Sequence, residues 1–79
     1  MNKVAMIEAL LFASKRGIDL NQLAQIVEST KPEVLSLLEE LKEKFEQEEH
    51  GVKLEQVGKL YSFYTKPEYA ESVAKLVIR

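Results

Sequence analysis

The chain has 79 residues, of which 46% are hydrophobic and 30% are charged, and its formal net charge is −2. These values are typical of one folded domain, and they exclude a disordered chain and a global positive charge that would attract nucleic acid or anionic lipid. The sequence has no cysteine, which excludes disulfides and thiolate metal sites, and its apolar runs are shorter than a membrane span requires. We therefore expect one soluble, cytoplasmic domain over residues 1–79.

Residues 2–14 predict a first helix that is apolar around most of its circumference. One interpretation is a central helix that its own fold covers, and the other is a helix that a second subunit partly buries. We expect Gly17 to end the helix as its left-handed C′ residue. At about 100° per residue, the apolar side chains fall on three sides of the helix: Val4, Ile7 and Leu11; Met6 and Leu10; and Phe12 with Ala5 and Ala9.

A second, shorter helix follows. Ile18 is expected in a short extended stretch, after which Asp19 caps the helix and Gln22 stands three residues further on. Residues 28–30 leave room only for a tight turn before the next helix. Two helices joined in this way indicate a helix–turn–helix, although many helical hairpins share the pattern.

The third predicted helix, over residues 30–49, is the longest. Thr30 and Glu33 have the spacing of a capping box, in which each side chain bonds to the backbone amide of the other residue. Pro32 lies in the first turn, where its missing N–H costs nothing. We expect Gly51 to end the helix in a left-handed conformation.

The pattern then changes to alternation, which predicts a β-hairpin turning at Gly58-Lys59 with Val57 opposite Leu60. This register places Val52, Leu54, Tyr61 and Phe63 on the inner face, where we expect Tyr61 and Phe63 to be core residues. The outer face carries Val57, Leu60 and Tyr64, which either cover a neighbouring helix or bind a partner.

The last predicted helix begins at Pro67. Thr65-Lys66-Pro67-Glu68 repeats the letters of Thr30-Lys31-Pro32-Glu33, and we expect the same capping chemistry at both places. Together the elements predict an α+β, mostly α, winged helix-turn-helix with a three-helix core, a two-stranded hairpin wing and a C-terminal fourth helix. Because apolar residues continue to the end of the chain, we expect the natural protein to extend further.

Catalytic and metal-binding patterns are not found in the sequence. His50 is the one histidine and the three glycines lie far apart, so neither a zinc site nor a phosphate-binding loop is expected. No nucleophile, base and orienting group come together. We expect no enzyme activity, no metal and no cofactor.

Direct DNA binding is also disfavoured, although the predicted topology would suit it. Residues 31–49 contain three lysines against seven glutamates, and the hairpin tip adds only Lys59. A recognition helix must approach a polyanion, and this one would repel it. Its exposed face, with Glu40, Glu43 and Gln47, is either solvated or a site for a basic partner segment.

Two stretches of the sequence resemble a known family. Residues 7–14, IEALLFAS, followed by Asp19-Leu20-Asn21-Gln22-Leu23-Ala24, are similar to the opening of segregation and condensation protein B. Gly51-Val52-Lys53-Leu54, then Val57 and Tyr61, then residues 65–69, TKPEY, match that family's hairpin and the start of its next helix. The resemblance covers nearly the whole chain, and the hairpin-to-helix motif is fairly specific.

The resemblance implies a winged-helix fold and a dimeric accessory subunit of the prokaryotic condensin complex in chromosome condensation and segregation. Its partners would be a second copy and the kleisin, segregation and condensation protein A, which bridges the SMC ATPase at the nucleoid. Family members carry two winged-helix domains in tandem, and this chain corresponds to the first. The rival hypothesis is a small winged-helix transcription regulator that binds DNA as a dimer.

The residues expected at a dimer or partner interface are the exposed apolar ones. They are Val57, Leu60 and Tyr64 on the hairpin and Met6 and Leu10 on the first helix. A contiguous apolar patch on a small domain normally marks a partner site, and a two-fold dimer is the commonest solution. The hairpin face is favoured slightly for the symmetric contact.

Overall fold

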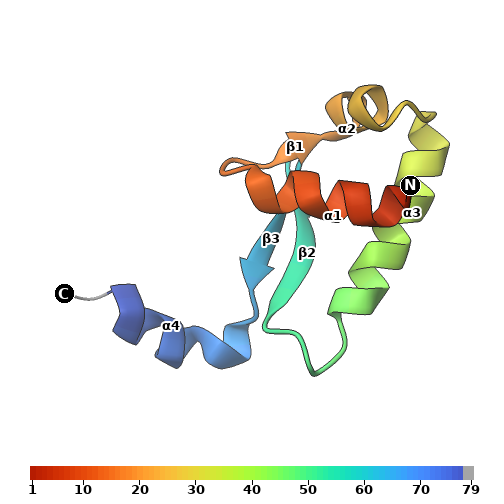
Figure 1. Ribbon diagram of the computed structural model, residues 1–79. Coiled ribbons are helices and arrows are strands. Elements are labelled where there is room, and N and C mark those ends of the chain that lie inside the picture. Colours follow the sequence, from red (N-terminus) through yellow and green to blue (C-terminus); the bar gives the residue numbers. More distant parts are fainter. Residues whose placement is uncertain (78–79) are drawn as a thin grey trace.

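The computed structural model describes the backbone of residues 1–77 and the side chains of residues 1–76. Three helices pack around a small antiparallel sheet with strand order β1-β3-β2, and a fourth helix follows the sheet (Figure 1). This arrangement is a winged helix-turn-helix and confirms the predicted fold class. The elements are α1 (Lys3–Ala13), β1 (Ile18–Asp19), α2 (Leu20–Val27), α3 (Lys31–Phe45), β2 (Val52–Val57), β3 (Leu60–Thr65), the 3₁₀ turn η1 (Pro67–Tyr69) and α4 (Ala70–Val77).

The core is built around α3. Its buried side chains recur at helical spacing and contact α1, α2 and the sheet, so one stripe of this helix connects every layer. The ten buried hydrophobic residues are Ile7 and Leu11 of α1, Ile18 of β1, Leu23 and Val27 of α2, Val34, Leu38, Leu41 and Phe45 of α3, and Leu54 of β2.

The predicted capping box opens α3. The Glu33 carboxylate accepts hydrogen bonds from the Thr30 backbone N–H at 3.0 Å and from the Thr30 hydroxyl at 2.8 Å, while the Glu33 N–H donates to the Thr30 hydroxyl oxygen. Because these bonds favour the ionised carboxylate, the backbone bond most of all, they lower the pKa of Glu33 below its ordinary value of 4.5. The predicted cap of α2 is also confirmed, since Asp19 accepts from the Gln22 N–H.

The predicted end of α3 was wrong. The helix stops at Phe45 and not at residue 49, and Gly51 does not adopt a positive φ. Packing of an apolar face provides most of the stability of a protein helix, and Glu48 and Glu49 stand where the apolar stripe would continue. The Phe45 ring instead packs against the rings of Phe63 and His50, with centroids 4.9 and 4.4 Å apart, and the chain turns away.

Gly17 has a different role from the one predicted. Helix α1 ends at Ala13, and Gly17 lies beyond it with φ +92°. A Cβ on Gly17 would lie 3.0 Å from the backbone oxygen of Tyr61, so glycine is required here for close approach to β3. That approach lets β1 pair with β3, and the predicted two-stranded wing is in fact part of a three-stranded sheet.

The predicted hairpin register is confirmed. Val57 pairs with Leu60, and Gly58 turns the chain with φ +61°. Leu54 is buried on the inner face, whereas Tyr61 and Phe63 are only half-buried against the core. They are therefore less central than predicted, because Tyr61 and Phe63 each also line a groove at the surface.

The two similar tetrapeptides do not share one chemistry. Thr65 belongs to β3, and Lys66 opens η1 without a side-chain capping bond. Lys66 keeps an extended backbone because its N–H donates to the Gly51 carbonyl at 2.9 Å, which delays the helix by one residue. Its side chain is 7% exposed, and its ammonium donates to the Gln47 carbonyl at 2.7 Å.

The register predicts how two leucines of one hairpin should differ. Leu54→Ala should lower the free energy of unfolding by about 2–5 kcal/mol because the side chain is 3% exposed. Leu60→Ala, at 40% exposure on the other face, should cost less than half as much. Urea unfolding followed by circular dichroism measures both, and equal losses would contradict the two-faced hairpin.

The capping box predicts a pH-dependent contribution to stability. Since the pKa of Glu33 is lower in the folded than in the unfolded state, this contribution is complete above the unfolded value and disappears as the pH falls through the folded one. Glu33→Gln should therefore be less stable than the native chain at about pH 6, with the difference shrinking towards about pH 3. Urea unfolding of both proteins at each pH measures it, and a difference that does not change with pH would contradict the assignment.

Candidate protein-interaction surfaces

The hairpin outer face consists of Val57, Leu60 and Tyr64, and the structure leaves it exposed. Val57 is 58% exposed and Leu60 and Tyr64 are 40% exposed. These side chains alternate with the inner ones along β2 and β3, so the register turns them away from the core. Val57 and Leu60 form one cross-strand pair, and Tyr64 lies further along the same face, opposite Lys53. Their proposed role in binding a partner stays a prediction.

The apolar circumference of α1 is divided between the core and the outside. Ile7 and Leu11 are buried, while Met6 and Leu10 are half-buried and pack against the core cluster. Only the exposed edges of Met6 and Leu10 are therefore available for the interface role proposed for them. The large apolar residue left most open on this helix is Phe12, at 86% exposure, which sequence reasoning did not place at the site.

Phe12 forms one wall of an apolar groove, which we call the α1 groove. Ala5, Ala9 and Phe12 recur at i, i+4 and i+7 and line one side. Phe45 from α3 and Val52 and Phe63 from the hairpin line the other, and Glu8 adds a carboxylate; the volume is about 430 Å³. The helical spacing of Ala5, Ala9 and Phe12 is visible in the sequence. The sequence does not show that α3 and the hairpin supply the opposite side of the groove.

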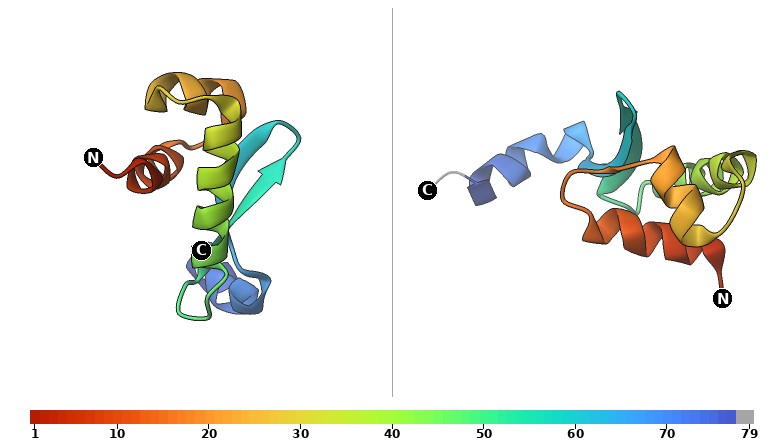
Figure 2. Two further views of the ribbon diagram at one scale, coloured as in Figure 1. Left: turned by 90° about the vertical axis from the view of Figure 1, so that its right-hand side faces the viewer. Right: turned by 90° about the horizontal axis from the view of Figure 1, so that it is seen from above.

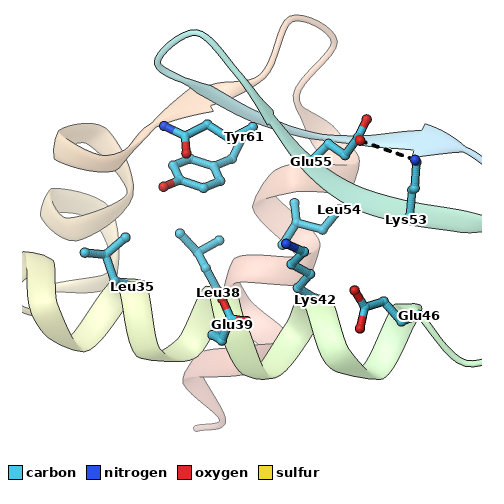
Figure 3. A pocket seen from close by; sticks show the side chains of 10 residues that line it. Leu35, Leu38, Glu39, Lys42, Glu46, Lys53, Leu54, Glu55 and Tyr61 are labelled. Carbon is cyan, nitrogen blue, oxygen red and sulfur yellow. Dashed lines mark ion pairs between the residues drawn. The ribbon is translucent and has the colours of Figure 1, made fainter.

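A second groove, of about 560 Å³, runs between α3 and the hairpin (Figure 3). Leu35 and Leu38 of α3 point towards Tyr61 across it. Both signs of charge line its sides, including Lys42 on α3, Glu46 directly after it, and an ion pair of 3.2 Å between Lys53 and Glu55 on β2. It therefore combines an apolar floor with a mixed rim, as polar-rimmed protein interfaces do.

The predicted acidic face of α3 is exposed but separate from both grooves. Glu40, Glu43 and Gln47 are all exposed, and none of them lines either groove. Gln47 lies just beyond the helix, where its side-chain amide donates to the Glu43 carbonyl at 3.4 Å. The structure thus places these residues together as predicted, and their proposed contact with a basic segment remains a hypothesis.

Other classes of site are not found in the part of the chain that the structure describes. Residues 1–77 contain no group of three or more histidine, cysteine, aspartate or glutamate side chains placed to hold a metal ion. Over the same residues, none of the helices has the length and apolar character needed to cross a membrane. The single histidine, His50, packs against Phe45.

The fold and the exposed surfaces define a winged-helix domain with several faces available to other chains. A family model described as segregation and condensation complex subunit ScpB matches residues 5–79. The chain belongs to this family. It is 40% identical to segregation and condensation protein B of Shouchella clausii over 95% of this chain and 39% of that protein. For the Geobacillus kaustophilus protein the identity is 38%, over 92% of this chain and 34% of that protein. The chain thus spans less than half the length of these relatives.

Solved structures show the same fold. A crystal structure of a dimer of the ScpB N-terminal domain complexed with a ScpA peptide superposes with a TM-score of 0.89 and 35% sequence identity, covering 96% of this chain and 88% of that one. ScpB from Mycobacterium tuberculosis superposes with a TM-score of 0.88 at 23% identity, over 95% of this chain and 47% of that one.

The charge of α3 predicts the response to DNA. The native chain should show no tight binding to duplex DNA at either low or physiological salt. Glu40→Lys combined with Glu43→Lys should leave the fold intact, because both side chains are exposed, and should create weak, salt-sensitive binding. Fluorescence titration at two salt concentrations measures this. Tight binding by the native chain that the two changes abolish would make the acidic face a DNA reader and contradict the prediction.

Proposed function

We propose that the chain is the N-terminal winged-helix domain of an accessory subunit of the prokaryotic SMC–kleisin complex. In this role it self-associates and holds a segment of the kleisin, segregation and condensation protein A, and through it the SMC ATPase. The observation that carries the proposal is the likeness to a domain solved as a dimer with a ScpA peptide, of which this chain covers 88%. The whole protein would act in chromosome condensation and segregation in the cytoplasm, at the nucleoid.

The surfaces of the domain support a role in binding rather than catalysis. Exposed apolar residues occupy the hairpin outer face and the α1 groove, and clustered exposed apolar residues normally mark a site for a partner. An accessory subunit that joins a second copy and a kleisin needs at least two such contacts. The 34–39% coverage of the relatives supports a natural protein with a further domain, as the two-domain organisation of the family implies.

The rival function, a winged-helix transcription regulator, shares the topology but not the charge. Residues 31–45 of α3 carry three lysines against four glutamates, and Glu46, Glu48 and Glu49 follow directly. The glutamates of such a helix offset what its lysines gain from phosphate neutralisation, which is a large part of the affinity of DNA-binding proteins. The domain therefore binds protein rather than DNA.

The proposed function predicts two associations of the 79-residue chain. Sedimentation equilibrium across about a hundredfold range of concentration should show a monomer–dimer equilibrium, and a peptide from segregation and condensation protein A should bind saturably in a calorimetric titration. Leu60→Glu combined with Tyr64→Glu should weaken one of the two associations without unfolding the domain, because both residues are on the hairpin outer face.

Lys59→Glu, a charge change at the tip of the same hairpin, is the matched control and should leave both associations nearly unchanged. The circular dichroism spectrum of each variant confirms the fold. A native chain that stays monomeric at every concentration and does not bind the peptide would contradict the proposed function.

A further inference from the structure

An apolar stripe, which we call the α4 stripe, runs from the end of η1 along α4. It consists of Tyr69 of η1 and Val73 and Leu76 of α4, which recur at i, i+4 and i+7. Tyr69 is 38% exposed, Leu76 is 71% exposed and Val73 is half-buried. Glu71 and Lys75 lie on the opposite side of the helix at about 100° per residue. The helix extends away from the three-helix core, with its end far from α1 (Figures 1 and 2).

The α1 groove matches this stripe in spacing, length and chemistry. Ala5, Ala9 and Phe12 repeat the same i, i+4, i+7 pattern, and the two small residues let a second helix approach closely. At 1.5 Å per residue, Tyr69 to Leu76 and Ala5 to Phe12 each span about 10 Å.

None of the described α4 residues lines the α1 groove of the same chain. The Lys66 ammonium donates to the Gln47 carbonyl at 2.7 Å and the Lys66 N–H donates to the Gly51 carbonyl at 2.9 Å. These bonds fix the point at which the chain leaves the hairpin, and η1 and α4 follow from that point.

We propose that the α4 stripe of each chain docks in the α1 groove of a second copy, so that two chains exchange their last helices about a two-fold axis. The inference rests on the self-association in the proposed function and names its contact surfaces. A helix in an apolar groove is a recurrent mode of recognition, and here each copy offers both halves. The exchange joins the two domains at the base of their hairpins and leaves the hairpin outer face free for the kleisin segment.

Cross-linking tests the exchange directly because the native chain has no cysteine. One variant carries Ala9→Cys and the other Val73→Cys, residues that meet in the middle of the contact whichever way α4 runs. Mild oxidation of an equimolar mixture should produce a disulfide between the two variants well above the level of a mixture in which Ala74→Cys replaces Val73→Cys. A chain carrying both Ala9→Cys and Val73→Cys that forms only an internal disulfide would overturn the proposal.

A pair of aspartate variants tests the energetic role of the stripe. Leu76 and Ala74 are both exposed on α4, so neither change should unfold the domain, but they lie on different sides of the helix. Leu76→Asp should raise the dimer dissociation constant at least about tenfold, and Ala74→Asp less than about threefold. If the native chain dimerises and both variants dimerise equally well, the exchange is wrong while self-association stands. If the native chain is monomeric throughout, the self-association of the proposed function fails as well.

Discussion

The buried ammonium of Lys66 fixes the point at which the packed part of the domain ends and the last helix begins. By bonding to the backbone carbonyl of Gln47, it ties the end of β3 to the loop after α3. The last helix then starts at the base of the hairpin and runs outward, so that it does not cover α1. Within one chain, the α1 groove and the apolar side chains of Tyr69 and Leu76 are both left exposed.

Packing and charge favour a protein over a nucleic acid as the partner of this domain. Helix α3 buries Val34, Leu38, Leu41 and Phe45 in the core. Its outer face carries glutamates, whose negative charge would repel a nucleic acid. The winged-helix architecture is therefore retained while its usual DNA-reading helix serves as the centre of the core. Under the proposed function, the exposed apolar surface on α1, the hairpin and α4 would make the contacts with other chains. The chain belongs to the ScpB family, and the ScpB N-terminal domain to which it is similar was solved as a dimer with a ScpA peptide.

Features that depend on residues close in sequence could be predicted. The capping box of Thr30 and Glu33 and the turn at Gly58 need only neighbours a few positions away, and the strand register followed from alternation. The role of Gly17, the early end of α3 and the different use of Thr65 depend on contacts with distant segments, which the sequence does not display. The α1 groove was missed for the same reason, since α1, α3 and the hairpin each supply part of it.

The central claim is that the apolar stripe of α4 becomes covered only when two copies meet. Hydrogen–deuterium exchange of the α4 amides, measured on the 79-residue chain across about a hundredfold range of concentration, tests it most directly. The account predicts fast exchange in α4 at low concentration and protection that rises together with the fraction of dimer. Protection that is already complete in the monomer, or fast exchange that persists after the dimer has formed, would contradict it.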